Sequence, residues 1–432
     1  MPREAAKYLL PVMLLALGCP PASSGDADGG ATAGNDGGPQ ASDAAGLQGD
    51  AGNLPLGDSG LASSDGGGAT TGDGGSSPSS DGGSAGRVDG SVASSDGGAG
   101  PFTVIGLADR YDGDAGGYRE LRAIDPVSGA SALIKTVPGM TWTGMGTNAY
   151  DPALRRIHVI GGAAQDYRSR LYTLAAVSGD LVASPLMEPM TPGTDAGYGL
   201  DYNWSGGLGV RSDGKLVGVT WAETGDAGSE QLRSIDPMTG STTLLGTTSG
   251  LDWVIGGATA FDPTSDTFYV IGSSNADTRE RLFSIDGKTG AVLANPLIDG
   301  NGGPSDAGFG LSWPAGIHVR SDGTLVGLSM AYSGTANTTE LRSLDKATGA
   351  TSVIQQLPGF GWVLGGQAVI DRARDVLFVM GSSSQDTATR LFVIDAVTGE
   401  VLASPAIDGT NGGTPDAGGW GSGWSGGLYI VR

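Results

Sequence analysis

The chain has 432 residues, of which 79 are glycine, and its formal net charge at neutral pH is −22. Such an excess of acidic residues repels a phosphate backbone and argues against nucleic acid as a partner. The one cysteine, Cys19, cannot form a disulfide within the chain, so a folded part of an exported chain must be stabilised by its core alone.

Residues 1–18 have the layout of an export signal. Arg3 and Lys7 stand near the start, and an apolar run from Tyr8 to Leu17 follows them, which is too short to span a bilayer. We therefore expect residues 1–18 to be a signal peptide and the rest of the chain to be exported.

Cys19 directly follows that run, in the string Leu15-Ala16-Leu17-Gly18-Cys19, which resembles a lipobox. The resemblance implies that Cys19 becomes the new N-terminus and carries acyl chains such as palmitate, which anchor a protein to a membrane. Ala16 stands where a lipobox usually has leucine, and the alternative is an ordinary secretory signal with an incidental thiol. Pro20, in place of an aspartate, is compatible with onward sorting to the outer membrane of the cell envelope.

Residues 19–101 are predicted to be a tether. After the cysteine they consist almost wholly of Gly, Ser, Ala, Asp, Pro and Thr, with no aromatic residue, so they cannot form a core and we expect disorder. A flexible coil of this length spans about 50 Å. Its aspartates outnumber its one basic residue, Arg87, and their repulsion should extend it further.

Residues 102–432 carry a repeat of short apolar runs separated by Gly, Asp and Ser turns. One copy of its clearest unit is Glu340-Leu-Arg-Ser-Leu-Asp-Lys-Ala-Thr-Gly349, and a second version, such as Arg281-Leu-Phe-Ser-Ile-Asp-Gly-Lys-Thr-Gly290, lies midway between copies of the first. The final glycines, spaced by 50, 61, 50, 59 and 50 residues, are Gly129, Gly179, Gly240, Gly290, Gly349 and Gly399. The repeat therefore consists of six units in three pairs.

These units predict an all-β fold, a six-bladed β-propeller with four antiparallel strands per blade and pairwise, threefold repeats. Phe102 to Leu107 aligns with the second strand of the odd units, so the first unit lacks its inner strand. Trp424 to Arg432 matches an inner strand and has nothing after it. We therefore predict that the C-terminal strand closes blade one, and we expect the protein to be a monomer.

Residues 102–432 resemble a bacterial β-propeller lipoprotein with Leu-x-x-Ile-Asp-x-x-Thr-Gly repeats. The resemblance covers the whole predicted domain and implies its architecture. It does not imply one activity, because such repeats occur in propellers of many functions.

Few residues suit catalysis or metal binding. His158 and His318 lie at repeat positions where the sister units have unrelated side chains, so we interpret both histidines as structural. The sequence has no Cys/His cluster for a metal. The oxygen-rich loops Asp299–Asp306 and Asp408–Asp416 leave calcium open as a cofactor, although neither follows the alternation of an EF-hand.

The best candidate for a binding site is aromatic. One tryptophan per blade stands next to the start of each predicted inner strand, and the six are Trp142, Trp204, Trp253, Trp313, Trp362 and Trp424. At one mouth of the channel they would form a ring for stacking on sugars or anchoring a protein, supplemented by Tyr198, Phe309 and Trp420. The alternative is that each tryptophan wedges between adjacent blades.

The leading hypothesis is a non-enzymatic binding or scaffold module, with a protein or glycan ligand at one propeller mouth, on a lipoprotein that faces the surface or the periplasm. The alternative is an exported hydrolase or lyase that uses carboxylates in the central channel. An enzyme should show polar residues in the channel that break the threefold repeat, whereas a scaffold can stay nearly threefold. The sequence assigns no catalytic residue.

Overall fold

The computed structural model describes residues 101–111, 117–163, 168–187, 204–224, 227–277, 279–299, 313–332, 337–383, 388–407 and 424–432. The predicted signal peptide, Cys19 and nearly all of the predicted tether lie outside the described residues. Every regular element in the described ranges is a β-strand, and these ranges hold no helix long and apolar enough to cross a membrane.

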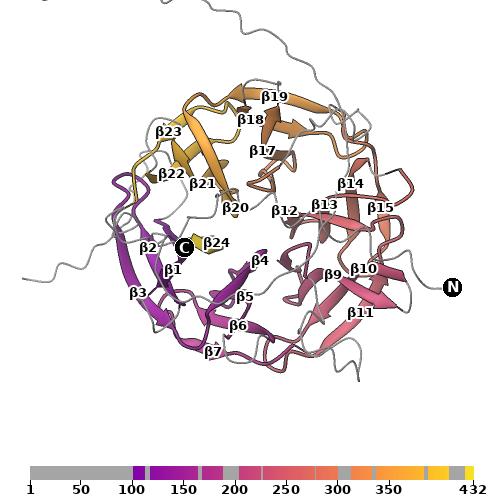
Figure 1. The fold of residues 1–432 in the computed structure, drawn as a ribbon, viewed down its shortest axis with the longest axis horizontal. Coiled ribbons are helices and arrows are strands. Elements are labelled where there is room, and N and C mark those ends of the chain that lie inside the picture. Colours follow the sequence, from indigo (N-terminus) through magenta and orange to yellow (C-terminus); the bar gives the residue numbers. More distant parts are fainter. Residues whose placement is uncertain are drawn as a thin grey trace, which may run out of the picture. The chain divides into compact units, whose positions relative to one another are not determined.

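The described strands form six four-stranded antiparallel sheets that stand around a central channel as propeller blades (Figure 1). The innermost strands of blades one to six are β24 (Trp424–Val431), β4 (Trp142–Asp151), β8 (Leu208–Val210), β12 (Trp253–Asp262), β16 (Ile317–Val319) and β20 (Phe360–Asp371). The second strands are β1 (Thr103–Tyr111), β5 (Arg156–Gly162), β9 (Leu216–Thr224), β13 (Thr267–Ser273), β17 (Leu325–Tyr332) and β21 (Val376–Ser383).

The outer half of each blade completes a simple meander. The third strands are β2 (Gly117–Ile124), β6 (Ser169–Ala175), β10 (Ala227–Ile235), β14 (Glu280–Asp286), β18 (Asn337–Leu344) and β22 (Thr389–Asp395). The outermost strands are β3 (Ser131–Val137), β7 (Leu181–Ala183), β11 (Thr242–Thr247), β15 (Val292–Ala294), β19 (Thr351–Gln356) and β23 (Val401–Ala403). The predicted six-bladed, all-β propeller is confirmed.

Blade one is closed by the C-terminal strand, as predicted. β24 pairs antiparallel with β1, so that Ile430 lies opposite Val104 and Tyr429 lies opposite Ile105. The innermost and second strands of this blade therefore come from opposite ends of the propeller sequence, and the ring is held shut by a sheet without a covalent link between them.

The repeat motif marks the third strand and the turn that follows it. Its leucine is fully buried in every blade, at Leu121, Leu171, Leu232, Leu282, Leu341 and Leu391. In the first copy Asp125 Oδ1 accepts the N–H of Val127 at 2.8 Å, and the N–H of Gly129 donates to the Asp125 carbonyl at 2.8 Å. The six final glycines adopt φ values between 70° and 78°, which side chains other than glycine rarely tolerate.

The core of the propeller lies at the six junctions between neighbouring blades. At the junction of blades one and two, Leu107 and Leu121 of the first pack with Ile157 and Tyr172 of the second. Equivalent clusters of buried apolar side chains fill the other five junctions. Because the apolar packing lies between blades, the channel and its two mouths are free to carry a site.

Candidate functional site

The predicted tryptophans of the odd blades are buried between blades. Trp204, Trp313 and Trp424 are 5%, 1% and 4% exposed. Trp424, for example, packs in one cluster with Phe378 of blade six and Val104 of blade one. Each of the three fills the junction between an even blade and the odd blade that follows it.

Glycines on the second strands make room for these indoles. A Cβ at Gly106 would lie 2.7 Å from Cζ3 of Trp424, and one at Gly218 would lie 2.8 Å from Cζ3 of Trp204. Gly327 has the same relation to Trp313. The faces of these three tryptophans are thus covered by protein, and the structure places them as wedges between blades.

The even-blade tryptophans have a different position because another residue fills their junction. Met140, Leu251 and Phe360, each two residues before an even-blade tryptophan, are buried at 0%, 1% and 8% exposure. Trp142 and Trp253 are therefore not needed as wedges, and they lie on the face of the propeller where the innermost strands begin. The side chain of Trp362, like Tyr198, Phe309 and Trp420, lies outside the described residues.

Trp142 and Trp253 differ in what lies beside them. Trp142 is half-buried, and its indole covers Gly162, where a Cβ would lie 2.4 Å from the indole Nε1. Ser273 occupies the position of Gly162 in blade four, as the pairing of Trp142 with Gly162 and of Trp253 with Ser273 shows. Trp253 is 55% exposed. Among the described residues, the structure therefore does not bring the six predicted tryptophans together in a uniform ring.

Trp253 stacks on Trp221, a residue of β9 in blade three. Their ring centroids are 5.7 Å apart and their planes are inclined by 22°. The Nε1–H of Trp253 donates to Oδ1 of Asn275 at 2.8 Å, and the N–H of Asn275 donates to Oδ2 of Asp252 at 2.6 Å. We call Trp221, Trp253, Asn275 and Asp252 the Trp253 platform. Its exposed indole is fixed both by stacking and by a hydrogen bond.

A buried carboxyl group belongs to the strand that pairs with Trp221. Glu230 lies directly opposite Trp221 in the β9–β10 register and is 1% exposed. Its carboxylate accepts the hydroxyl of Ser205 at 2.9 Å. Burial raises the pKa of Glu230 to about 7, and the charge of Asp252 adds to that rise. Near neutral pH this carboxyl group therefore exchanges between its protonated and its charged form.

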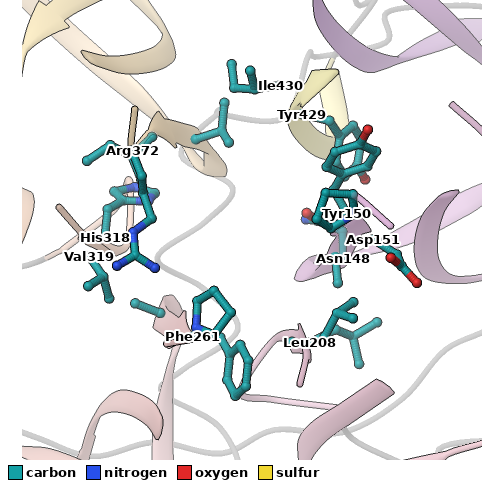
Figure 2. Close-up of a pocket in the computed structure, with 18 of the residues that line it drawn as sticks. Asn148, Tyr150, Asp151, Leu208, Phe261, His318, Val319, Arg372, Tyr429 and Ile430 are labelled. Atoms are coloured by element: carbon teal, nitrogen blue, oxygen red, sulfur yellow. The ribbon is translucent and has the colours of Figure 1, made fainter. Parts of the chain in front are cut away.

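A cavity of about 770 Å³ occupies the channel and is lined by the ends of the innermost strands and the turns that follow them (Figure 2). Phe261 and Leu208 supply its apolar wall. His318 and Arg372 lie together on one side, and Asn148, Tyr150 and Tyr429 lie on the other. These side chains come from all six innermost strands or the turns that follow them.

The charged groups around this cavity are already paired within the protein. Arg372 Nη1 lies 3.0 Å from Asp262 Oδ1, and Asp371 pairs with both Arg374 and Arg432. Asp151 Oδ1 accepts the N–H groups of the turn that follows it. In the described part of the chain, the carboxylates that line the cavity therefore cap turns and balance arginines.

The two histidines have different surroundings. His158 is buried in β5, where its Nδ1 lies 3.1 Å from Thr173 Oγ1, and burial lowers its pKa to about 4. This histidine is part of a blade. His318 lines the cavity, its Nε2 lies 3.2 Å from the carbonyl oxygen of Ala315, and burial lowers its pKa to about 4 as well. Its ring is neutral at physiological pH.

The calcium hypothesis concerns loops that lie almost wholly outside the described residues. Of Asp299–Asp306 only Asp299 is described, and no residue of Asp408–Asp416 is. Among the side chains that the structure does describe, no three His, Cys, Asp or Glu residues gather in a way that could hold a metal ion.

Three comparisons place the chain among known proteins only distantly. No protein-family model matches it, and no curated protein matches its sequence. Similar solved structures include TolB from Acinetobacter baumannii, which is 12% identical over 68% of this chain and 62% of TolB, with a TM-score of 0.43. An oligogalacturonate lyase in complex with manganese is 14% identical over 69% and 73% of the two chains, with a TM-score of 0.40. The β-propeller domain of the Trilobed protease from Pyrococcus furiosus is 12% identical over 69% and 77%, with a TM-score of 0.38.

The alignment with TolB thus spans less than two thirds of the TolB chain. Likenesses this distant carry no conclusion about the ligand or the activity of this chain.

Sequence reasoning missed Trp221, Glu230 and Asn275 at one face and Arg372 in the cavity. A signal for two of them was present in the repeat itself. Trp221 stands three residues after a repeat glycine, where the sister units have Asp109 and Met330. Arg372 follows a repeat aspartate, where the sister units have proline. Departures from the threefold repeat, rather than its recurring residues, mark both sites.

Proposed function

We propose that this chain is an exported glycan-binding lipoprotein, anchored through Cys19 in the outer membrane and carrying its propeller on the tether of residues 19–101. The anchor rests on the single cysteine directly after the apolar run of the predicted signal peptide. The tether rests on a composition that cannot form a core. In this arrangement the propeller reaches a ligand at a distance from the membrane.

The Trp253 platform is the observation that carries the glycan ligand. An indole face binds the apolar C–H face of a sugar ring, and a fixed indole loses little rotational freedom when it binds. Trp253 meets both conditions, since it is 55% exposed and is fixed by Trp221 and Asn275. Asn275 and Asp252 lie beside the indole and provide polar groups for the hydroxyls at the edge of the sugar.

His318 and Arg372 break the threefold repeat in the channel, as an enzyme would require, but the described carboxylates of the channel favour binding over glycoside hydrolysis. Glycoside hydrolysis requires two carboxyl groups that face each other across the substrate. The described carboxylates of the cavity, Asp151 and Asp371, instead bind turn N–H groups and arginines. The proposal therefore assigns the glycan to the platform without a catalytic step.

A fluorescence titration tests the ligand. The chain downstream of the predicted signal, residues 19–432 with Cys19→Ser, is titrated with cell-wall and exopolysaccharide fragments while tryptophan emission is followed. We expect a saturable shift with at least one fragment, and its loss in Trp253→Ala at an unchanged Tm. A panel that gives no shift would contradict the glycan proposal and direct the search to protein partners.

Metabolic labelling tests the anchor. The full chain is expressed in a bacterial host with labelled palmitate, beside the variant Cys19→Ser. We expect label and membrane association in the wild type and neither in the variant. Equal labelling of the two proteins, or no labelling of either, would overturn the assignment of Cys19 as the lipidated residue.

A further inference from the structure

We propose that the channel cavity is a second binding site, for a small neutral molecule rich in hydroxyl groups, of monosaccharide or disaccharide size. The site is separate from the Trp253 platform, because it lies where the innermost strands end and the platform lies where they begin. Its volume of about 770 Å³ is in the range of cavities that enclose small ligands.

The cavity side chains break the threefold repeat. His318 is equivalent to Gly209 and Tyr429, and Arg372 is equivalent to Pro152 and Pro263. A side chain that ring closure required should recur in all three pairs of blades, as the repeat leucines and the odd-blade tryptophans do. The side chains on this wall of the cavity are therefore not part of the recurring set that closes the ring.

The walls of the cavity offer hydrogen bonds without net charge. The Ala315 carbonyl can only accept, so His318 carries its proton on Nε2 and leaves Nδ1 as an acceptor, with no partner in the described part of the chain. Asn148 adds an amide on the opposite wall (Figure 2). The charge of Arg372 is balanced by Asp262 at 3.0 Å. A ligand with hydroxyls meets these groups without leaving a charge unpaired.

The backbone of the innermost strands also offers hydrogen-bonding groups to the channel. Each innermost strand is paired with a neighbour on one side only, so the N–H and C=O groups of its other edge have no strand partner. These edges line the channel at all six blades (Figure 1). Hydroxyl groups both donate and accept, so a polyol satisfies such a mixed edge better than an anion or an apolar molecule does. Phe261 and Leu208 provide the apolar surface for the C–H face of the same ligand.

The test uses variants that restore the threefold repeat, because the fold already accommodates these residues at equivalent positions. Residues 19–432 with Cys19→Ser are examined by saturation-transfer NMR and calorimetry against glucose, galactose, N-acetylglucosamine, maltose and cellobiose, with glucuronate as the charged probe. We expect at least one neutral sugar to bind, and its affinity to fall about tenfold in His318→Gly and in Arg372→Pro. The melting temperature of each variant checks that the propeller is folded.

Trp253→Ala separates this site from the platform. We expect the affinity of the cavity ligand to be unchanged in that variant, even if the glycan proposal for the platform fails. Three results would overturn the cavity proposal: no saturable binding of any neutral sugar, binding that both threefold-restoring variants retain, or a preference for glucuronate over the neutral sugars.

Discussion

At the junctions of blades one and two and of blades three and four, the preceding blade pairs its second and third strands in the same way but carries different chemistry at one matched pair of positions. In the first, Asp109 lies opposite Arg119, and the two form an ion pair of 2.7 Å with both side chains largely buried. In the second, the same positions hold Trp221 and Glu230. At the first junction, the two residues at these positions bind each other in a buried ion pair. The second holds a stacked pair of tryptophans, of which Trp253 is exposed, beside a carboxyl group that titrates near neutral pH.

The difference shows which residues build the ring and which are free to vary. The repeat leucines, turn glycines and junction apolar residues recur in all pairs of blades and fill the core. Trp221 and Glu230 stand at positions outside this recurring apolar set, although Glu230 is itself buried. A single pair of blades can therefore acquire a binding surface there while the other two pairs keep the ring closed.

The largest effect should come from removing the strand that closes the ring. Deletion of Leu428 to Arg432 removes Leu428 from the core of blades six and one, and Tyr429 and Val431 from the core of blades one and two. We expect the cooperative melting transition to be lost, because blade one then has no innermost strand. Scanning calorimetry of the deletion variant checks this, and a melting temperature equal to that of the full chain would refute the role of this strand.

The ion pair at the first junction should be the next most sensitive feature. Asp109→Ala removes the carboxylate that pairs with the buried Arg119 guanidinium, which should cost about 3–5 kcal/mol of the free energy of unfolding. Replacing both residues by the equivalent pair of blade five, with Asp109→Met and Arg119→Thr, should recover most of that loss. Urea unfolding measures both variants, and an equal loss in the double variant would contradict the assignment to a stranded charge.

The second junction should respond to pH in a way that the first does not. The pKa of Glu230 is about 7 in the folded protein against 4.5 as its ordinary value. The folded state thus holds this proton more tightly, so its stabilising effect is complete below pH 4.5 and is lost as the pH rises toward and through 7. Glu230→Gln should raise the free energy of unfolding at pH 8 by up to about 3 kcal/mol and leave it unchanged at pH 4.

Urea unfolding at the two pH values measures this difference. Burial also raises the pKa of Glu280 to about 7, so part of the pH dependence should remain in the variant. A gain of stability at pH 4 as large as that at pH 8 would contradict a titrating Glu230.

The smallest effect should come from Trp221, the partner on which Trp253 stacks. Trp221→Met installs the residue that blade five has at this position, so the fold should accept it. Trp253 then loses its stacking partner, and we expect the affinity for a bound glycan to fall about fivefold. Calorimetric titration measures the change, and an unaltered affinity would show that Trp253 is held by Asn275 alone.

The periodicity of the sequence was enough to predict the propeller, its four-stranded blades and the closing strand, because each repeat unit carries a complete set of turn and core residues. It could not separate wedge tryptophans from surface tryptophans. That separation depends on Met140, Leu251 and Phe360, which fill the junctions in place of the nearby indoles. The repeat marks His318 and Arg372 as departures, but it could not place them in one cavity, because only the closed ring brings innermost strands from different blades to one space.

The most direct test of the account compares two equivalent tryptophans. The glycan fragment found by fluorescence is titrated calorimetrically into the chain with Trp253→Ala and into the chain with Trp142→Ala. Trp142 begins its innermost strand as Trp253 does, but its indole covers Gly162. The preceding blade has Asp109 at the position that Trp221 occupies beside Trp253. We predict an affinity at least about tenfold lower for Trp253→Ala and an unchanged affinity for Trp142→Ala. Equal losses in the two variants, or no loss in either, would contradict a binding surface specific to blades three and four.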